Sequence, residues 1–363
     1  MLEGLEAIRR RPGMYIGDVR DGSGLHHLLW EAVGNGIDLH LRRQAAHLKV
    51  WVAGSEITVE DDGPGFPLRK DGLPVFAEAL ELIHGSATLY DDHRPRVHIG
   101  PAIFGVGLAV VNALSSRLLV ETRTEGRGFR QRYAQGVRVG PLEHLGPAAK
   151  TGTRIQFTPD PTIFGDGQVS PVRIETRLRE LAYLNPGLTI RTQDTTLRAR
   201  DGLRGWLRAR MPADATAPIC CFSARHSNHV WVEVALTWVD DSSPADVQSF
   251  VSQFATYDHG AHLLGLWEGI VRALRDTSQG PSIPKRLRES VRDECLRPGL
   301  IAVVHAGLYD PRFGSPTRDR LMSPEARVAV RELTTGHLTS FFLRNPVLRR
   351  QLVTRFQHAG AAS

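Results

Sequence analysis

The chain has 363 residues, of which 41% are hydrophobic and 23% charged, and its formal net charge is +6 at pH 7. This composition is ordinary for globular proteins, and the length suggests two domains of ~100–200 residues each. No apolar run reaches the ~18 residues of a membrane span, and the N-terminus lacks a signal-peptide pattern. The three cysteines show no metal-ligand spacing, so we expect a cytoplasmic protein with reduced thiols and no membrane contact.

The positive charge comes almost entirely from arginine, since the chain has only four lysines. A basic balance favours contact with nucleic acid or with nucleotide phosphates. Codon bias in a GC-rich genome explains the arginine content equally well, so charge alone does not decide between these interpretations.

Residues 24–40 have the period of an amphipathic helix. Beside the apolar stripe runs a polar one, at i, i+4, i+8 and i+11: His27, Glu31, Asn35 and Asp38. Glu31 could orient an attacking water as a general base, with His27 one turn earlier holding the carboxylate in place. Asn35 offers a hard oxygen ligand for Mg²⁺. Taken alone, the stripe is better explained as a polar helix face in solvent.

Residues 48–52 and 57–60 alternate as two strands joined by a Gly-Ser turn, and the second strand ends in Asp61-Asp62-Gly63-Pro64-Gly65. Asp61 could accept a hydrogen bond from the amino group of a purine, while Gly65 would let the ring approach the backbone. A simple strand-ending turn explains the same residues, because Asp and Gly are common in turns.

The next segments predict a helical run over 75–84, a long loop over 85–104 and a helix over 105–115 that opens with Gly105-Val106-Gly107. Free N–H groups at a helix start form an anion site, and glycines at 105 and 107 would leave room for a phosphate. Glycine also simply begins helices. A hairpin around 125–128 and a strand over 153–157 follow.

A shift in composition over 212–218 divides the chain into domains 1–213 and 214–363. The second domain is expected to hold strands over 230–236 and 300–304, a helix over 261–276 and helical residues over 324–357. Arg318 falls in a polar loop of this domain. It could neutralise the terminal phosphate of a nucleotide, or it is one surface arginine among many.

Several motifs, in the same order, resemble the ATPase half of the DNA gyrase B family of type IIA topoisomerases, within the GHKL superfamily. In the first domain they are residues 11–18, Glu31…Asn35…Asp38, 61–67, 105–107 and 151–153; in the second they are 232–236, 262–263, 299–304 and 310–313. The resemblance implies an α/β protein with a GHKL (Bergerat-type) ATP-binding sandwich followed by a ribosomal-S5-like transducer domain.

The resemblance also implies cofactors and roles. The cofactors are ATP and Mg²⁺, with Asn35 as the metal ligand. The catalytic residues implied are Glu31, His27 and Arg318. The residues implied to bind the nucleotide are Asp61, Gly65, Thr153, Gly105, Gly107 and Arg130, the last at the pocket mouth, where the family meets coumarin antibiotics.

The chain departs from the family pattern at several of these motifs. A Glu and an Arg that pair in the family are replaced by Leu39 and Pro64, so both partners are lost together. The sequence after His84 lacks the lysine of the family's lid, and the family's Gln-Thr-Lys reads Pro316-Thr317-Arg318. Arginine keeps the charge, but its planar fork differs from a compact ammonium.

Two classes of function stay open. The first is a gyrase-B-like, slow Mg²⁺-dependent ATPase. It would support DNA topology change only with a gyrase A-type or cleavage-domain partner chain, since the chain stops after the transducer. The second is a non-catalytic nucleotide-binding modulator of gyrase or an antibiotic-resistance decoy, with a repurposed ATP-using enzyme as a further alternative.

Two expectations concern assembly and DNA. A missing N-terminal arm and the altered lid predict that dimerisation is weak or absent. Any contact with DNA is expected to be electrostatic, through arginines of the last helical segment such as Arg349 and Arg350.

Overall fold

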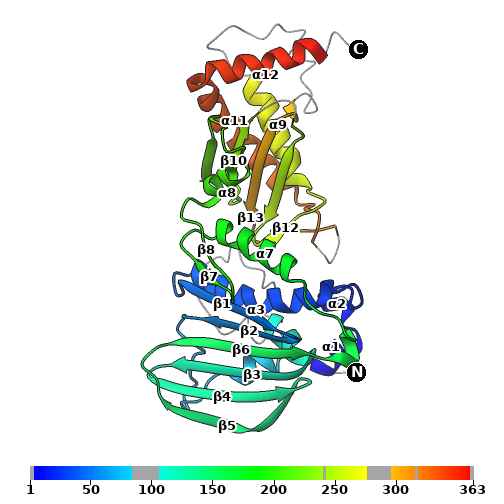
Figure 1. Ribbon diagram of the computed structural model, residues 1–363, viewed down its shortest axis with the longest axis vertical. Coiled ribbons are helices and arrows are strands. Elements are labelled where there is room, and N and C mark those ends of the chain that lie inside the picture. The colour runs from blue at the N-terminus through cyan, green and yellow to red at the C-terminus, as the bar shows by residue number, and fades with distance from the viewer. Residues whose placement is uncertain (1–3, 84–105, 240–242, 276–295, 315–317, 360–363) are drawn as a thin grey trace. The chain divides into compact units, whose positions relative to one another are not determined.

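A computed structural model describes residues 4–83, 106–239, 243–275, 296–314 and 318–359. The backbone forms two compact units, Met1–Gly202 and Leu203–Ser363 (Figure 1). The composition shift placed the boundary at 213/214, whereas the structure places most of helix α8 (Gly202–Arg210) in the second unit. Trp206 of this helix packs on Phe250 of that unit, with 5.1 Å between the ring centroids.

The first unit contains an eight-stranded sheet in the order β5-β4-β3-β6-β2-β1-β7-β8. Neighbouring strands are antiparallel except β1 and β7. The strands are β1 (His47–Ala53), β2 (Glu56–Asp61), β3 (Ser115–Thr124), β4 (Arg127–Ala134), β5 (Val137–Pro147), β6 (Gly152–Pro159), β7 (Thr189–Arg191) and β8 (Thr196–Arg198). The predicted strands and both predicted hairpins are confirmed.

The helices of this unit are α1 (Leu5–Arg10), α2 (Gly13–Ile16), α3 (Ser23–Leu41), α4 (Phe76–Leu80), α5 (Gly107–Ala113), α6 (Pro161–Phe164) and α7 (Pro171–Leu184). Helix α3 covers the predicted range, and its apolar stripe, including Leu28 and Leu29, is fully buried. The predicted run over 75–84 shortens to α4. The expected loop over 85–104 lies outside the described residues.

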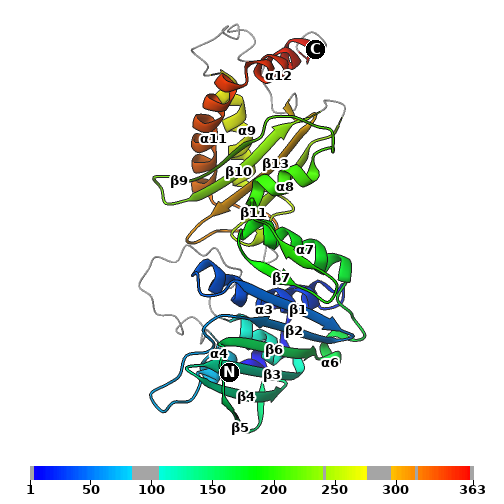
Figure 2. The ribbon, with the colours of Figure 1, turned by 60° about the vertical axis from the view of Figure 1, so that its left-hand side comes forward.

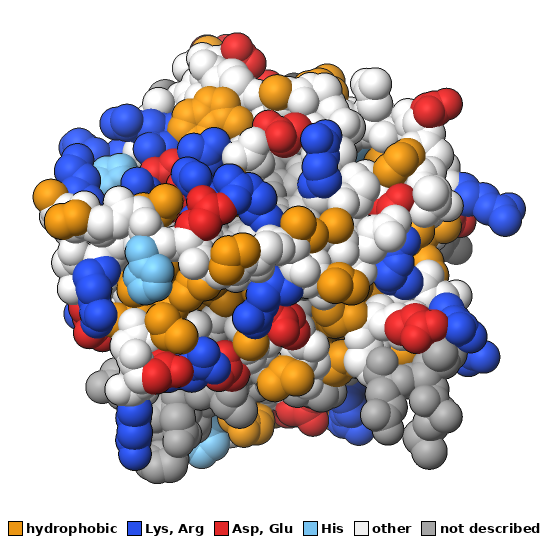
Figure 3. All heavy atoms as spheres, turned by 90° about the horizontal axis from the view of Figure 1, so that it is seen from below, with side chains coloured by type: hydrophobic (Ala, Val, Ile, Leu, Met, Phe, Trp, Pro, Cys, Tyr) orange, Lys and Arg blue, Asp and Glu red, His pale blue; other side chains and the backbone are white. Residues whose placement is uncertain are grey.

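The pairing register sorts the side chains of the sheet into two rows. One row runs Asp61, Thr153, Thr122, Phe129. The neighbouring row alternates in charge across six strands: Lys49, Glu60, Arg154, Glu121, Arg130, Glu143. Because successive residues of a strand point to opposite faces, the two rows face opposite sides of the sheet. Figure 3, viewed from the β5 end, likewise shows positive and negative side chains interspersed on the surface.

The second unit contains a five-stranded sheet in the order β12-β11-β13-β10-β9. Its elements besides α8 are β9 (Cys220–Arg225), β10 (Trp231–Trp238), β11 (Asp246–Val251), β12 (Phe254–Ala255), α9 (Ala261–Arg275), β13 (Leu300–Gly307), α11 (Pro324–Arg344) and α12 (Pro346–Ala359). Strand β13 is buried along its whole length, and α9 and α11 lie side by side (Figure 2).

Two details of this unit depend on single residues. Helices α9 and α11 approach closely because Gly265 lacks a side chain: a Cβ there would overlap the carbonyl oxygen of Arg327. The helical stretch predicted over 324–357 is two helices, because Pro346 cannot continue α11 and the residue before it, Asn345, ends the helix.

Candidate functional site

The polar stripe of α3 is organised around Glu31. Nε2 of His27 lies 3.1 Å from Oε1 of Glu31, one turn along the same helix. Nδ2 of Asn35 donates to the carbonyl oxygen of Glu31 at 2.9 Å. The Glu31 side chain is only 12% exposed. The stripe is therefore an ordered group of contacts and not a solvated helix face.

The first residue of α5 closes one side of this group. A Cβ built on Gly107 would overlap Oε2 of Glu31 and lie 3.2 Å from its Cδ. Only glycine leaves room for the carboxylate at this distance from the backbone. The start of α5 and the carboxylate of α3 thus lie in direct contact. Gly105, the other predicted phosphate-binding glycine, lies outside the described residues.

Asp61 is fixed at the end of β2 by two backbone donors. Its Oδ1 accepts hydrogen bonds from N–H of Gly63 at 2.9 Å and of Thr153, its cross-strand neighbour, at 3.3 Å. Burial raises the pKa of Asp61 to about 6, although both hydrogen bonds act in the opposite direction. The carboxylate is therefore preorganised and poorly solvated, as an acceptor for a specific ligand donor would be.

Its neighbour Asp62 has a different environment. Oδ1 accepts from the backbone N–H groups of Ala46 and His47, and Oδ2 lies 2.7 Å from Nδ1 of His47. Burial opposes ionisation, but these hydrogen bonds hold the pKa of Asp62 below its usual range. Asp62 therefore anchors the start of β1, and Asp61 is the carboxylate left for a ligand.

Leu39 packs near Asp61, at a position where the resemblance implies a charged residue. It is 6% exposed, and a Cβ on Gly63 would come within 2.7 Å of its Cδ1. An apolar contact between α3 and the loop after β2 thus stands where the resemblance implies an ion pair. A leucine can be buried at this position without the desolvation penalty that a charged side chain would carry.

Close packing requires two further glycines, one in the loop after β2 and one in α3. Gly65 has a φ of 79°, and a Cβ on it would lie 2.5 Å from the carbonyl oxygen of Arg123 and 2.7 Å from Oγ1 of Thr122. On Gly36 of α3, a Cβ would overlap Leu48 and lie 3.8 Å from Cβ of Asp61. Gly36 was not among the residues predicted from the sequence. The available signal was a glycine inside a long helix, where it costs stability and therefore suggests a packing reason.

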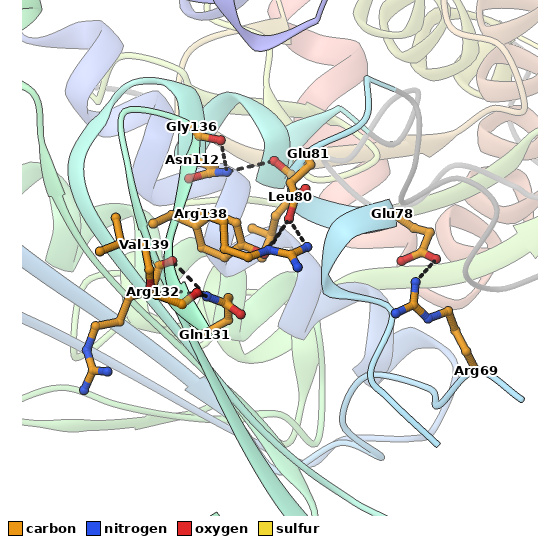
Figure 4. A network of polar contacts seen from close by, with 12 residues as sticks. Arg69, Glu78, Leu80, Glu81, Asn112, Gln131, Arg132, Gly136, Arg138 and Val139 are labelled. Carbon is orange, nitrogen blue, oxygen red and sulfur yellow. Dashed lines mark hydrogen bonds and ion pairs between the residues drawn. The ribbon is translucent and has the colours of Figure 1, made fainter. Parts of the chain in front are cut away.

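Helix α5 is held in place by a polar network at its far side (Figure 4). Nδ2 of Asn112 donates to the carbonyl oxygens of Leu80 at 2.9 Å and Gly136 at 3.4 Å. Nearby, Oε1 of Glu81 accepts from Arg138 at 2.6 Å and from the Tyr133 hydroxyl at 3.0 Å. This network ties α4, α5 and the β4–β5 hairpin together, and so fixes the helix that begins at Gly107.

The structure brings most of the predicted residues together, but not all. Arg130 lies in the alternating-charge row, where its Nε donates to Glu121 at 2.7 Å and NH1 lies 3.4 Å from Glu143. The pairing register places this row on the face of the sheet away from Asp61 and Thr153. Arg318 belongs to the second unit, where its Cζ lies 4.2 Å from the centroid of Phe254.

Each of the two units matches a known protein family. Residues 20–163 match the family of histidine kinase-, DNA gyrase B- and HSP90-like ATPases, and residues 202–363 match the DNA gyrase B family. Over these residues the chain belongs to the DNA gyrase B family. The expected fold, a GHKL ATP-binding sandwich followed by a transducer domain, is confirmed.

Gyrase B relatives match along the whole chain. The DNA gyrase B protein of Enterococcus faecalis is 32% identical over 100% of this chain and 58% of its own length, and that of Caulobacter vibrioides is 33% identical over 100% and 48%. The chain therefore spans about half the length of these relatives. The 43K ATPase domain of Thermus thermophilus gyrase B, solved with an aminocoumarin, has a TM-score of 0.76 and 29% identity, with 98% of this chain and 94% of that one covered.

Gyrase B of Myxococcus xanthus has a TM-score of 0.77 and 26% identity, with 97% and 99% covered. Both solved gyrase B structures thus match across the two units. Among the helices of this gyrase B family member that the structure describes, none is both long enough and apolar enough to cross a membrane.

Proposed function

We propose that the chain binds ATP and hydrolyses it slowly with Mg²⁺. The observation that carries this proposal is the position of Glu31, held by His27 on its own helix and pressed against the start of α5 at Gly107. A carboxylate confined beside a helix N-terminus can meet both a water molecule and an adjoining phosphate.

Asp61 is the proposed adenine-binding residue. Its Oδ1 is fixed by the Gly63 and Thr153 N–H groups, so the carboxylate can accept a hydrogen bond from the amino group of adenine without reorganisation. With a pKa of about 6, Asp61 is mostly ionised at neutral pH. The glycines at 63 and 65 let the loop beside Asp61 pack closely against Leu39 and the backbone of Arg123, which helps to fix its position.

Asn35 is the proposed ligand for Mg²⁺. Because its Nδ2 is engaged by the Glu31 carbonyl, its Oδ1 is the atom left for a hard cation. A single amide oxygen suits this ion, which keeps several waters and binds substrate phosphates. When bound, the ion would neutralise phosphate charge.

Glu31 would act as the general base. It would take a proton from the water that attacks the terminal phosphorus, while the bond to the leaving ADP oxygen breaks. His27 would hold the carboxylate in the orientation that receives this proton. Arg318 is the proposed source of positive charge at the terminal phosphate.

The test is phosphate release with Mg²⁺ and ATP, combined with titration calorimetry using a non-hydrolysable analogue. Replacement of Glu31 with Gln should lower turnover by ~10²–10⁴-fold and leave analogue binding in place. Glu56, exposed at the start of β2, offers a matched control, and Glu56→Gln should change neither quantity. Equal turnover by wild type and Glu31→Gln would remove Glu31 from this role.

A second candidate is a nucleotide-binding modulator of gyrase, or a decoy that sequesters antibiotics, without turnover. The contact between Leu39 and Gly63 favours it. An apolar side chain near Asp61 would affect how adenine is held but adds no group that could take part in hydrolysis. Analogue binding together with no phosphate release above buffer would make this the better proposal.

The remaining parts of the proposal concern partners and location. We propose a gyrase A-type or cleavage-domain chain as a partner in DNA topology change; the relatives, which are named as the B subunits of DNA gyrase, support the idea of a partner subunit. Weak or absent dimerisation stays a prediction, which light scattering with and without the analogue would check. A cytoplasmic location belongs to the same proposal, as do the reduced thiols of Cys220 and Cys221.

A further inference from the structure

Arg318 is stacked on an aromatic ring of its own unit. Its Cζ lies 4.2 Å from the centroid of Phe254, which in turn packs edge-on against Phe313 with 6.4 Å between ring centroids. The backbone of Arg318 has a φ of 63°, an uncommon conformation for a residue with a side chain. Such conformations persist only where the surroundings impose them, so the position of Arg318 is held by specific contacts.

The backbone after Arg318 is pinned to the turn that follows Phe254. N–H of Asp258 donates to the carbonyl oxygen of Asp319, and N–H of Leu321 donates to that of His259, both at 2.9 Å. Ala261 N–H donates to Leu321 at 2.8 Å. His259 also has a positive φ, of 57°. Two strained segments are thus bound to each other by three backbone hydrogen bonds.

A buried polar cluster holds this turn from beneath. Oγ of Ser249 lies 2.6 Å from Oγ1 of Thr256 and 2.9 Å from Nδ1 of His259. Oγ1 of Thr256 lies 3.1 Å from Nε2 of His262, which is fully buried. Burial lowers the pKa of His262 to about 3, so its ring is neutral at physiological pH and serves as a hydrogen-bond partner. The turn after Phe254 is therefore held both by this cluster and by the backbone hydrogen bonds to the segment after Arg318.

We propose that Phe254 is a positioning residue for Arg318 and is the reason that arginine works at this place. The inference rests on the proposed ATPase function. A guanidinium stacks its planar face on a ring and keeps its N–H donors in the plane, where they can meet phosphate oxygens. A lysine ammonium has no such plane, so the ring would hold it less well. The aromatic side chain at 254 and the arginine at 318 act as one unit.

The experiment is a double-mutant cycle on the full chain with Phe254→Leu and Arg318→Lys. Leucine keeps an apolar side chain against Phe313 but removes the ring face. Each change alone should lower kcat about 3- to 30-fold, the range of a cation–π contact, with KM for ATP unchanged because Asp61 is untouched. The two together should lower kcat no further than one alone.

Two further variants separate positioning from general damage. Phe254→Tyr keeps the ring and should retain kcat within about twofold. Phe222→Leu removes a different stacked phenylalanine of the same unit and should leave kcat unchanged. The Phe222 ring stacks on His337 with 4.2 Å between the ring centroids. Retention of wild-type kcat in Phe254→Leu, or effects that simply multiply in the double variant, would overturn the proposal.

A readout that does not need turnover completes the design. In protein carrying isotope-labelled arginine, the Nε–Hε signal of Arg318, assigned by its loss in Arg318→Lys, should show a ring-current shift. The shift should disappear in Phe254→Leu and persist in Phe222→Leu; its absence from the wild type would overturn the stack itself. Lack of ATP turnover by the wild type would instead overturn the proposed function, and with it the role of Arg318, whatever this signal shows.

Discussion

The carboxylate of Glu31 lies against the α-carbon of Gly107, so that any side chain at position 107 would occupy the same space as Oε2. The two residues come from segments far apart in the sequence, and Gly107 begins the short helix that Asn112 holds in place. The geometry of the proposed base is therefore set both by His27 of its own helix and by a residue of another helix.

Replacement of Gly107 with Ala should displace the Glu31 carboxylate and lower ATP turnover about 10- to 100-fold, because misplacement of a catalytic group by about 1 Å has effects of this size. Alanine favours helix over glycine by up to ~1 kcal/mol, so unfolding should not account for the loss. Steady-state kinetics and thermal unfolding together check this. Gly336, which has open space around it in α11, provides the control variant Gly336→Ala, with no expected effect on turnover.

Asp61 and Asp62 should respond to pH with opposite signs. Because the pKa of Asp61 is raised in the folded state, ionisation of this carboxyl group destabilises the fold. The free energy of unfolding should therefore fall as pH rises from about 4 to about 6. Asp61→Asn removes that cost, so at about pH 7.5 it should raise the free energy of unfolding by up to ~3 kcal/mol while weakening ATP binding. Urea denaturation at several pH values measures the difference, which should vanish near pH 4.

Asp62 supplies the matched comparison. Its pKa is lowered, so its ionised form stabilises the fold at neutral pH, and that stability is lost as pH falls through the folded-state pKa. Asp62→Asn should therefore destabilise at about pH 7.5 and have little effect in acid. If both variants shift stability in the same direction at neutral pH, the assigned environments are wrong.

Leu39 should not tolerate a lone charge. Leu39→Glu places a carboxylate in a buried apolar contact with the loop at Gly63, which should cost about 3 kcal/mol or more in the free energy of unfolding. Leu41→Glu, on the exposed end of the same helix, should stay within about 0.5 kcal/mol.

Addition of Pro64→Arg to Leu39→Glu tests whether the two positions still behave as a pair. The added arginine should recover part of the lost stability, because it supplies the missing counter-charge. Urea denaturation of the single and double variants gives the coupling. A double variant no more stable than Leu39→Glu would show that the pair cannot be restored by these two changes.

Contact with DNA, where it occurs, should involve Arg350 and not Arg349. The sequence predicts both arginines on the last helical segment, but Arg349 is buried, at 7% exposed, whereas Arg350 is exposed. Arg350→Ala should reduce the log–log salt slope of duplex binding by up to about 0.9. Arg349→Ala should leave the slope unchanged and lower stability. Fluorescence anisotropy across a salt series checks this, and equal slopes for both variants and wild type would exclude both residues.

The sequence alone determined the local features of this protein. Helix α3 with its stripe of His27, Glu31 and Asn35, and the hairpin that ends in Asp61, follow from periodicity and turn residues, which act over a few neighbours. The gyrase B resemblance rests on the same short motifs. Each of these predictions needs only residues within one or two elements.

Tertiary structure alone decided which distant residues meet. Strand register separates Arg130 from Asp61, and packing buries Arg349, brings Gly107 against Glu31 and places Arg318 on Phe254. No local pattern encodes these contacts, because the sequence period fixes the face on which a side chain lies but not the element that faces it. That choice depends on how whole sheets and helices bury their apolar surfaces against one another.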